Sequence, residues 1–166
     1  MTEIDEKLQK VLAQARELSI PVSSKVQNEV VINNRAKTRF GCCRKTKSGY
    51  VIEISKFLIS GPEKAIYQTL AHEVLHTCPG CQNHSLDWKA HAETMNRFFD
   101  YNIKRTSTPL EMGMEEGGPV RSPRPVKYAF VCKKCGRRIE RSKKSKLVTH
   151  THLFKCLCGG KIEKLT

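Results

Sequence analysis

The spacing of apolar residues near the start of the chain predicts an amphipathic helix over residues 3–18. The apolar side chains recur there at helical spacing, so that one face of the helix carries Ile4, Leu8, Val11, Leu12, Ala15 and Leu18. Pro21 follows the pattern and marks the point by which the helix has ended. We expect this apolar stripe to pack against a core.

Three short segments after this helix have the composition of strands. Residues 29–33, 38–44 and 50–55 are rich in β-branched or aromatic residues. Residues 47–49, with the sequence Lys-Ser-Gly, separate the last two segments and predict a hairpin turn. A small antiparallel sheet is therefore expected.

A second helix is expected to follow the sheet. Ser60 is a suitable N-cap with Glu63 as its capping-box partner, and Pro62 lies in the first turn, where no amide donor is lost. The helix should run to about Thr77 and stop before Pro79.

A third helix is expected to start after Ser85 and to end near Tyr101. At helical spacing its inward face would carry Trp88, Ala92, Met95 and Phe99.

Composition divides the rest of the chain. Residues 106–126 are rich in Pro, Gly and Ser and lack periodicity, which is typical of a linker between domains. We assign residues 1–105 to a first domain and residues 127–166 to a smaller module that contains two cysteine pairs. The predicted fold class is α+β, with the small antiparallel sheet packed against the N-terminal helix and the second helix.

The formal charge of +14 is concentrated at one end. Residues 1–118 carry 16 Lys and Arg against 14 Asp and Glu, a net +2, whereas residues 119–166 carry 14 against 2, a net +12. A nearly neutral body with a basic end favours a polyanionic partner, most often nucleic acid. The alternative is a generic solvated basic surface.

Compartment and redox state follow from what the sequence lacks. The first residues have no apolar run of a signal peptide, and no stretch is long enough to span a bilayer, so we expect a cytoplasmic protein without a membrane partner. The eight cysteines fall in adjacent or near pairs, a spacing that favours metal binding over disulfides.

The motif HExxH lies on the second expected helix, as His72-Glu73-Val74-Leu75-His76. Spacing of four places both imidazoles on one helix face, where they can reach one zinc ion. Glu73 could then act as the general base that takes a proton from zinc-bound water as the water attacks a carbonyl. The opposite helix face carries Ile66, Leu70 and Val74, which would anchor it in the core.

A catalytic zinc needs three protein ligands, and two histidines are near enough in sequence to supply the third. His84 follows a Pro-Gly turn that can return the chain to the metal. His91 lies two turns further along and suits a packing or supporting role. We favour His84.

These residues resemble the SprT-like family of zinc metallopeptidases, which includes the DNA–protein crosslink protease Spartan. The HExxH motif, the motif His84-Ser85-Leu86-Asp87-Trp88 and the stretch of residues 35–41 are similar to the family's, and many members end in a basic zinc ribbon. The resemblance covers roughly residues 8–162. It implies a zincin-like fold, His72, His76 and His84 as ligands and Glu73 as base. Ser85 departs from the commoner Gly, and the long partner-binding tail of Spartan is missing from this sequence.

Two cysteine pairs near the end of the chain predict the structural zinc of a ribbon. Cys132 and Cys135 form a CxxCG knuckle, and Cys156 and Cys158 form a tighter CxCGG knuckle. His150 or His152 could replace one thiolate, although four cysteines are the simpler set. A module with so few large apolar residues could scarcely fold without the metal.

The stretch between the knuckles is strongly basic and is the expected nucleic-acid contact. Its cations suit phosphates without base specificity: Arg137, Arg138, Arg141, Lys143, Lys144 and Lys146. Tyr128, Phe130 and Phe154 could stack on exposed bases, but packing around the ribbon is the simpler expectation.

Two further cysteine pairs are open in role. Cys78 and Cys81 lie in the loop between His76 and His84 and could be a redox switch or a second metal site, although packing of the loop is favoured. Residues 42–43 are both cysteine and should lie on opposite faces of a strand in the core.

The leading functional hypothesis is a zinc-dependent endopeptidase that cleaves proteins bound or crosslinked to DNA, with one catalytic and one structural zinc. The alternative is a non-catalytic, zinc-containing nucleic-acid-binding protein. A peptidase acting on a soluble partner, with the ribbon as a protein-docking module, is a third possibility. Single-stranded and damaged DNA both fit the basic module.

Overall fold

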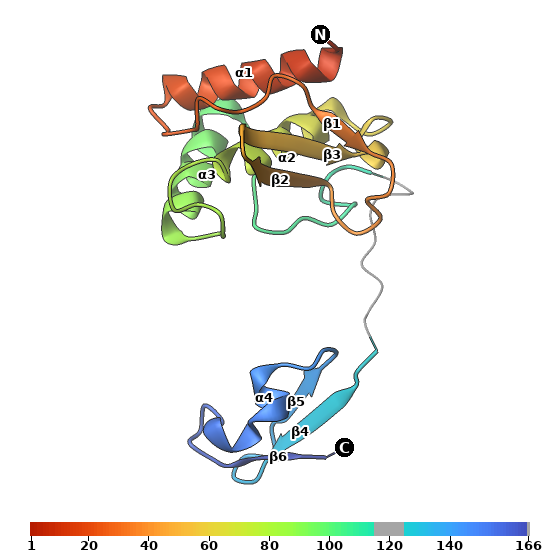
Figure 1. The fold of residues 1–166 in the computed structure, drawn as a ribbon, viewed down its shortest axis with the longest axis vertical. Helices are drawn as coiled ribbons and strands as arrows, with labels where there is room; N and C mark the ends of the chain where they lie inside the picture. Colours follow the sequence, from red (N-terminus) through yellow and green to blue (C-terminus); the bar gives the residue numbers. More distant parts are fainter. Residues whose placement is uncertain (115–124, 166) are drawn as a thin grey trace. The chain divides into compact units, whose positions relative to one another are not determined.

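A computed structural model describes residues 1–114 and 125–165 of the chain. The chain divides into two compact units, Met1–Arg121 and Ser122–Thr166 (Figure 1). Each unit has its own buried cluster of apolar residues. The α+β class is confirmed: both units contain a small three-stranded sheet and at least one helix. The described residues include no helix that is both long and apolar enough to cross a membrane.

Helix α1 (Glu3–Glu17) confirms the expected amphipathic helix. Thr2 caps it in a reciprocal capping box with Asp5, which satisfies two backbone donors that a helix start otherwise leaves unpaired. The inward face is fully buried through Leu8, Val11, Leu12 and Ala15, so this helix covers the core of the first unit.

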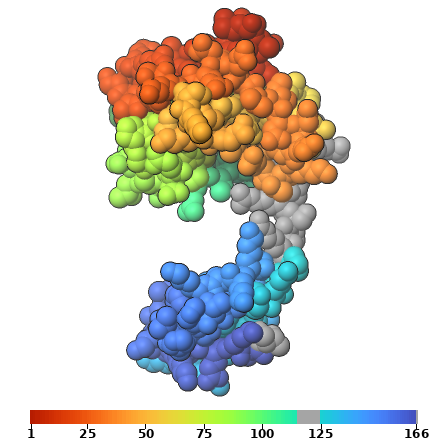
Figure 2. Space-filling view, in the orientation of Figure 1, coloured from red at the N-terminus to blue at the C-terminus, as the bar shows by residue number. Residues whose placement is uncertain are grey.

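The sheet of the first unit has the strand order β1–β3–β2. β2 (Gly41–Thr46) and β3 (Gly49–Ser55) form the expected antiparallel hairpin. β1 (Val31–Asn33) differs from expectation, because it pairs with β3 in parallel. Because β3 lies between β1 and β2, the chain that follows β1 passes from one edge of the sheet to the other before β2 begins. The chain between α1 and β2 spreads over one face of the unit in Figure 2.

Helices α2 (Glu63–Leu75) and α3 (Leu86–Phe99) are the expected second and third helices. Ser85 caps α3, and its hydroxyl accepts a hydrogen bond from the Trp88 N–H. The expected cap of α2 is wrong: Pro62 occupies the N-cap position, and no side chain caps that end.

Part of the segment expected to be a linker belongs to the first unit. Residues 109–113 form turns, and Met112 and Met114 are buried in the first core. Burial of these two side chains, together with the hydrogen bonds of Glu111 to Lys104 and Thr108, fixes the path of this polar stretch. The remainder of the expected linker, residues 115–124, lies outside the described residues.

The second unit is a small sheet of order β5–β4–β6 with short helical turns. β4 (Tyr128–Cys132) pairs antiparallel with β5 (Arg138–Arg141) and with β6 (Ile162–Lys164). The turns are α4 (Lys146–Thr149) and a 3-10 turn, η2 (Thr151–Leu153). Its buried cluster consists of Phe130, Cys132, Leu147, Cys156 and Ile162.

Candidate metal centre and catalytic cleft

Three histidines of the first unit converge on one point. His72 lies in the last turn of α2, His76 is the C-cap of that helix, and His84 lies just before α3. The Nε2 atom of His72 is 3.3 Å from that of His76 and 3.0 Å from that of His84. The helix and the turn that follows it thus bring together the three histidines that the motifs indicated.

Backbone carbonyls fix the orientation of two of these rings. Nδ1 of His72 lies 2.9 Å from the carbonyl oxygen of Lys104, and Nδ1 of His76 lies 2.7 Å from that of Cys81. A carbonyl can only accept a hydrogen bond, so both Nδ1 atoms carry the proton. Both Nε2 lone pairs are then free to bind a metal at the point of convergence.

Trp88, the single tryptophan, packs against all three imidazole rings. Trp88 is 1% exposed, and its ring centroid lies 4.8 Å from that of His72, 5.6 Å from that of His76 and 4.5 Å from that of His84. This packing restricts the imidazoles without using their nitrogens. His91 is not a member of this cluster, in agreement with the preference for His84.

Burial keeps the three histidines neutral and gives Glu73 a high proton affinity. Burial and the neighbouring imidazoles lower the pKa of His72 to about 3, and burial also lowers the pKa of His76 and His84. Burial raises the pKa of Glu73 to about 7, against a hydrogen bond from the Cys43 backbone and the charge of Arg39. A neutral imidazole is the form that binds zinc, and a carboxylate of this proton affinity suits a general base near neutral pH.

The site opens into a cleft of about 970 Å³. One wall is β2 with the residues before it, the floor is α2, and the other wall is the segment of residues 102–112. Glu73 lines this cleft together with the three histidines. A metal held by these histidines would therefore be accessible to an extended chain.

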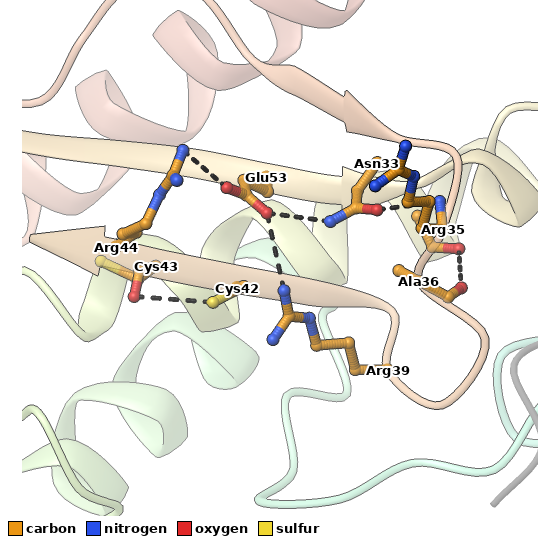
Figure 3. A network of polar contacts seen from close by, with 9 residues as sticks. Asn33, Arg35, Ala36, Arg39, Cys42, Cys43, Arg44 and Glu53 are labelled. Atoms are coloured by element: carbon orange, nitrogen blue, oxygen red, sulfur yellow. Dashed lines mark hydrogen bonds and ion pairs between the residues drawn. The ribbon is translucent and has the colours of Figure 1, made fainter.

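A buried carboxylate organises the rim beside β2. Glu53, on the central strand, accepts hydrogen bonds or ion pairs from Asn33, Arg44 and Arg39, at 3.1, 2.8 and 3.6 Å respectively (Figure 3). A buried carboxylate without such partners would be strongly destabilising. Because Arg39 also lines the cleft, this network positions one cation at the rim.

The other cysteines of the first unit are packed side chains. Cys78 and Cys81 are both fully buried in the core, in agreement with the favoured packing role. Cys43 packs against the same core, whereas the Cys42 thiol lies 3.8 Å from the Cys43 carbonyl and the residue lines the cleft. Cys42 is thus not part of the core, contrary to expectation.

The second unit gathers the four cysteines of its two knuckles. The sulfurs of Cys132 and Cys158 are 3.5 Å apart, and those of Cys135 and Cys156 are 3.7 Å apart. All four lie within 4.8 Å of one another, without His150 or His152.

The donors of both groups are consistent with zinc. Three imidazoles suit a site with an open position, and four thiols suit a closed structural site. A hydrogen bond from the Cys135 backbone is the main reason that the pKa of Cys132 falls to about 6, which favours the thiolate that binds a metal.

The expected nucleic-acid contacts of the second unit are all exposed: Arg137, Arg138, Arg141, Lys143, Lys144 and Lys146. Arg138 forms an ion pair with Glu140 at 2.8 Å. Phe130 is fully buried in the ribbon core and is not available for stacking on bases, whereas Phe154 is partly exposed.

Sequence reasoning missed one wall of the cleft. The composition predicts a linker from residue 106 onward, yet residues 102–112 line the cleft, and the Lys104 carbonyl orients His72. Asn96 holds it in place, because its amide accepts from the Ile103 N–H at 2.7 Å and donates to the Ile103 carbonyl at 3.1 Å. The only local signal was the apolar pair Met112 and Met114.

Comparison with known proteins supports these assignments at the level of a family. The model of the SprT-like family matches residues 6–107. A search of curated proteins gave no match. The family match covers most of α1, the first sheet, α2, the turn with His84 and α3, and it ends within the cleft wall.

Proposed function

Because the chain belongs to the SprT-like family, we propose that it is a zinc-dependent endopeptidase that cleaves proteins bound or crosslinked to DNA. The observation that carries the peptidase part is one arrangement. Three neutral histidines converge by their Nε2 atoms. The buried carboxylate Glu73, on α2 between His72 and His76, lines the same open cleft.

The residues divide the work as follows. His72, His76 and His84 would hold zinc, which when bound lowers the pKa of a water molecule and polarises a peptide carbonyl. Glu73 takes the proton of the attacking water and passes it to the leaving nitrogen. Trp88 and the carbonyls of Lys104 and Cys81 keep the imidazoles oriented.

The nucleic-acid part of the proposal rests on charge. Six exposed cations lie on residues 137–146 of the second unit, and the four clustered cysteines suit a structural zinc that would hold this module folded. Such a surface suits phosphates of any sequence, so the module would bring the peptidase to DNA without choosing a site. Proteins on that DNA would then be the substrates.

The test is cleavage of a basic DNA-binding protein by the zinc-loaded full chain, with and without single-stranded DNA. Glu73→Gln should keep zinc bound and reduce cleavage at least about 100-fold, because a general base contributes 100-fold to 10,000-fold. Zinc content measured by mass spectrometry is the control. Activity of Glu73→Gln close to that of the unmodified chain would contradict the mechanism.

The DNA arm of the same experiment separates the alternatives. Cleavage that depends on both Glu73 and DNA supports the full proposal. Cleavage that depends on Glu73 but ignores DNA would make the second unit a protein-docking module. Salt-sensitive DNA binding without any cleavage would favour the non-catalytic nucleic-acid-binding protein.

A further inference from the structure

A glycine occupies the first position of β2, where a strand gains little from this residue type. Gly41 pairs with Ile54 of β3. Glycine weakens a strand, because it has no side chain to pack and loses much conformational freedom on folding. Gly41 does not have a positive φ, in contrast to Gly49 and Gly80, so its backbone conformation is open to other residues. The reason for a glycine here must therefore lie in the space around it.

That space is occupied by the proposed general base. A Cβ placed on Gly41 would lie 2.8 Å from both Cγ and Oε1 of Glu73, and 2.7 Å from Cγ2 of Thr69. Contacts between nonbonded carbon atoms are most favourable at about 3.5–4.0 Å, so a side chain here would overlap both residues. The missing side chain therefore lets β2 lie directly against the Glu73 carboxylate.

The strand and the helix are both held in place by other contacts. β2 pairs with β3 along its whole length, and the Ser55 N–H donates to the Phe40 carbonyl at 2.6 Å. On the helix side, Val74 is fully buried in the first core. The β-branched side chain of Thr69 is also buried and is restricted in its rotamers. The Glu73 side chain is thus the part that a Cβ at this position would displace.

The same strand also donates a hydrogen bond to the carboxylate. The donor is the Cys43 backbone N–H, and the acceptor is Glu73. Gly41 and Cys43 are two residues apart on β2, so they share one face of the strand. A side chain at residue 41 that displaced Glu73 would therefore also weaken this hydrogen bond.

We propose that Gly41 is a positioning residue for the general base. Its lack of a side chain leaves the space that Glu73 occupies, and together with the Cys43 N–H it sets where the carboxylate lies in the cleft. Gly41 acts through Glu73. This inference rests on the proposed peptidase function and adds to it a residue outside the histidine motifs.

The kinetic test compares two glycines of the first unit. In the zinc-loaded full chain, Gly41→Ala should lower kcat about 10-fold to 100-fold with KM and zinc content unchanged, because a displacement of about 1 Å can cost about 100-fold. Gly61→Ala is the matched control: Gly61 also lacks a positive φ, and its Cβ would meet only the flexible end of Met114, at 3.2 Å, and the Leu58 carbonyl oxygen, at 3.4 Å, among its near contacts. Gly61→Ala should leave kcat unchanged. An unchanged kcat in Gly41→Ala would overturn the proposal.

A double-mutant cycle separates positioning from a general effect on the fold. In the Glu73→Gln background, Gly41→Ala should lower the remaining cleavage by less than about 2-fold, since the base through which Gly41 acts is already lost. A loss as large as that in the unmodified chain would contradict the positioning role.

Urea unfolding tests the same contacts without cleavage. Trp88 is the single tryptophan, so its fluorescence reports the first unit alone. Gly41→Ala should lower the urea midpoint. In combination with Glu73→Ala the loss should be at most about half as large, because only the Thr69 methyl group then remains in the way. Equal losses in the two backgrounds would show that the added Cβ does not meet Glu73, and the proposal would fail.

Removal of the Thr69 methyl group provides a second variant. Gly41→Ala combined with Thr69→Ser should be more stable than Gly41→Ala but should not recover kcat, because the overlap with Glu73 remains. Recovery of kcat would assign the space at Gly41 to Thr69 and contradict the proposal. Failure of this double variant to fold would show that the space serves the fold itself, with the same consequence.

The two kinds of measurement distinguish this inference from the function on which it rests. Cleavage that is insensitive to Gly41→Ala overturns the positioning role and leaves the peptidase intact. No cleavage by the unmodified chain contradicts the peptidase, and the urea measurements then still decide whether Gly41 makes room for Glu73.

Discussion

The two candidate metal sites are built in opposite ways. In the first unit the histidines lie on a fully packed core, and their rings are oriented by Trp88 and by backbone carbonyls. In the second unit the buried cluster has five residues, and two of them, Cys132 and Cys156, belong to the metal site itself. The core of the first unit does not include its metal ligands, so this unit should stay folded without the metal. The small core of the second unit includes two of its ligands, so this unit should need the metal to fold.

The largest expected effect of this difference is the response to a chelator. Removal of zinc should unfold the second unit, because structural zinc contributes about 10–16 kcal/mol in small zinc modules, and leave the first unit folded. NMR spectroscopy measures this difference. The backbone amide resonances of residues 125–165 should lose their chemical-shift dispersion, whereas those of residues 3–100 should keep it.

Single substitutions refine the chelation experiment. Cys135→Ser should unfold the second unit, whereas His84→Ala should abolish metal binding at the first site without unfolding it. Collapse of both units on chelation would show that the histidine core also depends on its metal.

The next effect concerns the packing beneath the histidines. Trp88→Ala should destabilise the first unit by about 3–5 kcal/mol, because it leaves a large cavity in the core. Urea unfolding followed by circular dichroism measures the change. Phe98→Ala is the control: Phe98 lies on the same helix but is 61% exposed, so its loss should change stability by less than about 0.5 kcal/mol.

A smaller effect is expected from the residue that holds the cleft wall. Asn96→Ala removes both hydrogen bonds to Ile103 and should loosen the Lys104 carbonyl that orients His72. Zinc affinity at the histidine site should fall by about 10-fold to 100-fold, as is typical when groups that support a ligand are lost. Competition with a chromogenic chelator measures the affinity.

The exposed Asn34 provides a matched control for this prediction. Asn34→Ala should leave zinc affinity unchanged. Equal affinities of Asn96→Ala and the unmodified chain would show that the wall holds its position by other contacts.

The smallest effect is expected from single cations of the ribbon. Lys143→Gln and Lys144→Gln should each lower the salt dependence of DNA binding by about one phosphate contact, with little change in base preference. Lys47→Gln, an exposed cation of the first unit, should leave the salt dependence unchanged. If it changed the dependence as much as the ribbon variants, the DNA surface would extend over both units.

Local features of the fold and site could be predicted because their causes lie within a few residues. The apolar stripe of α1, the cap of α3 at Ser85 and the hairpin of β2 and β3 follow from helical spacing, side-chain capping and turn composition. The same is true of the pairing of His72 with His76, since one helical turn separates them.

Features that depend on distant contacts could not be predicted in this way. The parallel pairing of β1 with β3 is set by how the chain crosses the sheet, and no local pattern encodes it. Residues 108–114 have the composition of a linker, but burial of Met112 and Met114 outweighs that composition.

The sequence by itself determined the two donor sets, the helix that carries the HExxH motif and the concentration of positive charge in the last 48 residues. Only the tertiary structure decided that the Lys104 carbonyl orients His72 and that Asn96 holds the cleft wall through both hydrogen bonds to Ile103. The physical reason is the distance along the chain between the residues that set each feature. Residue type and spacing fix what a helix turn or knuckle can bind, whereas the path of the chain through the core fixes which distant groups meet there.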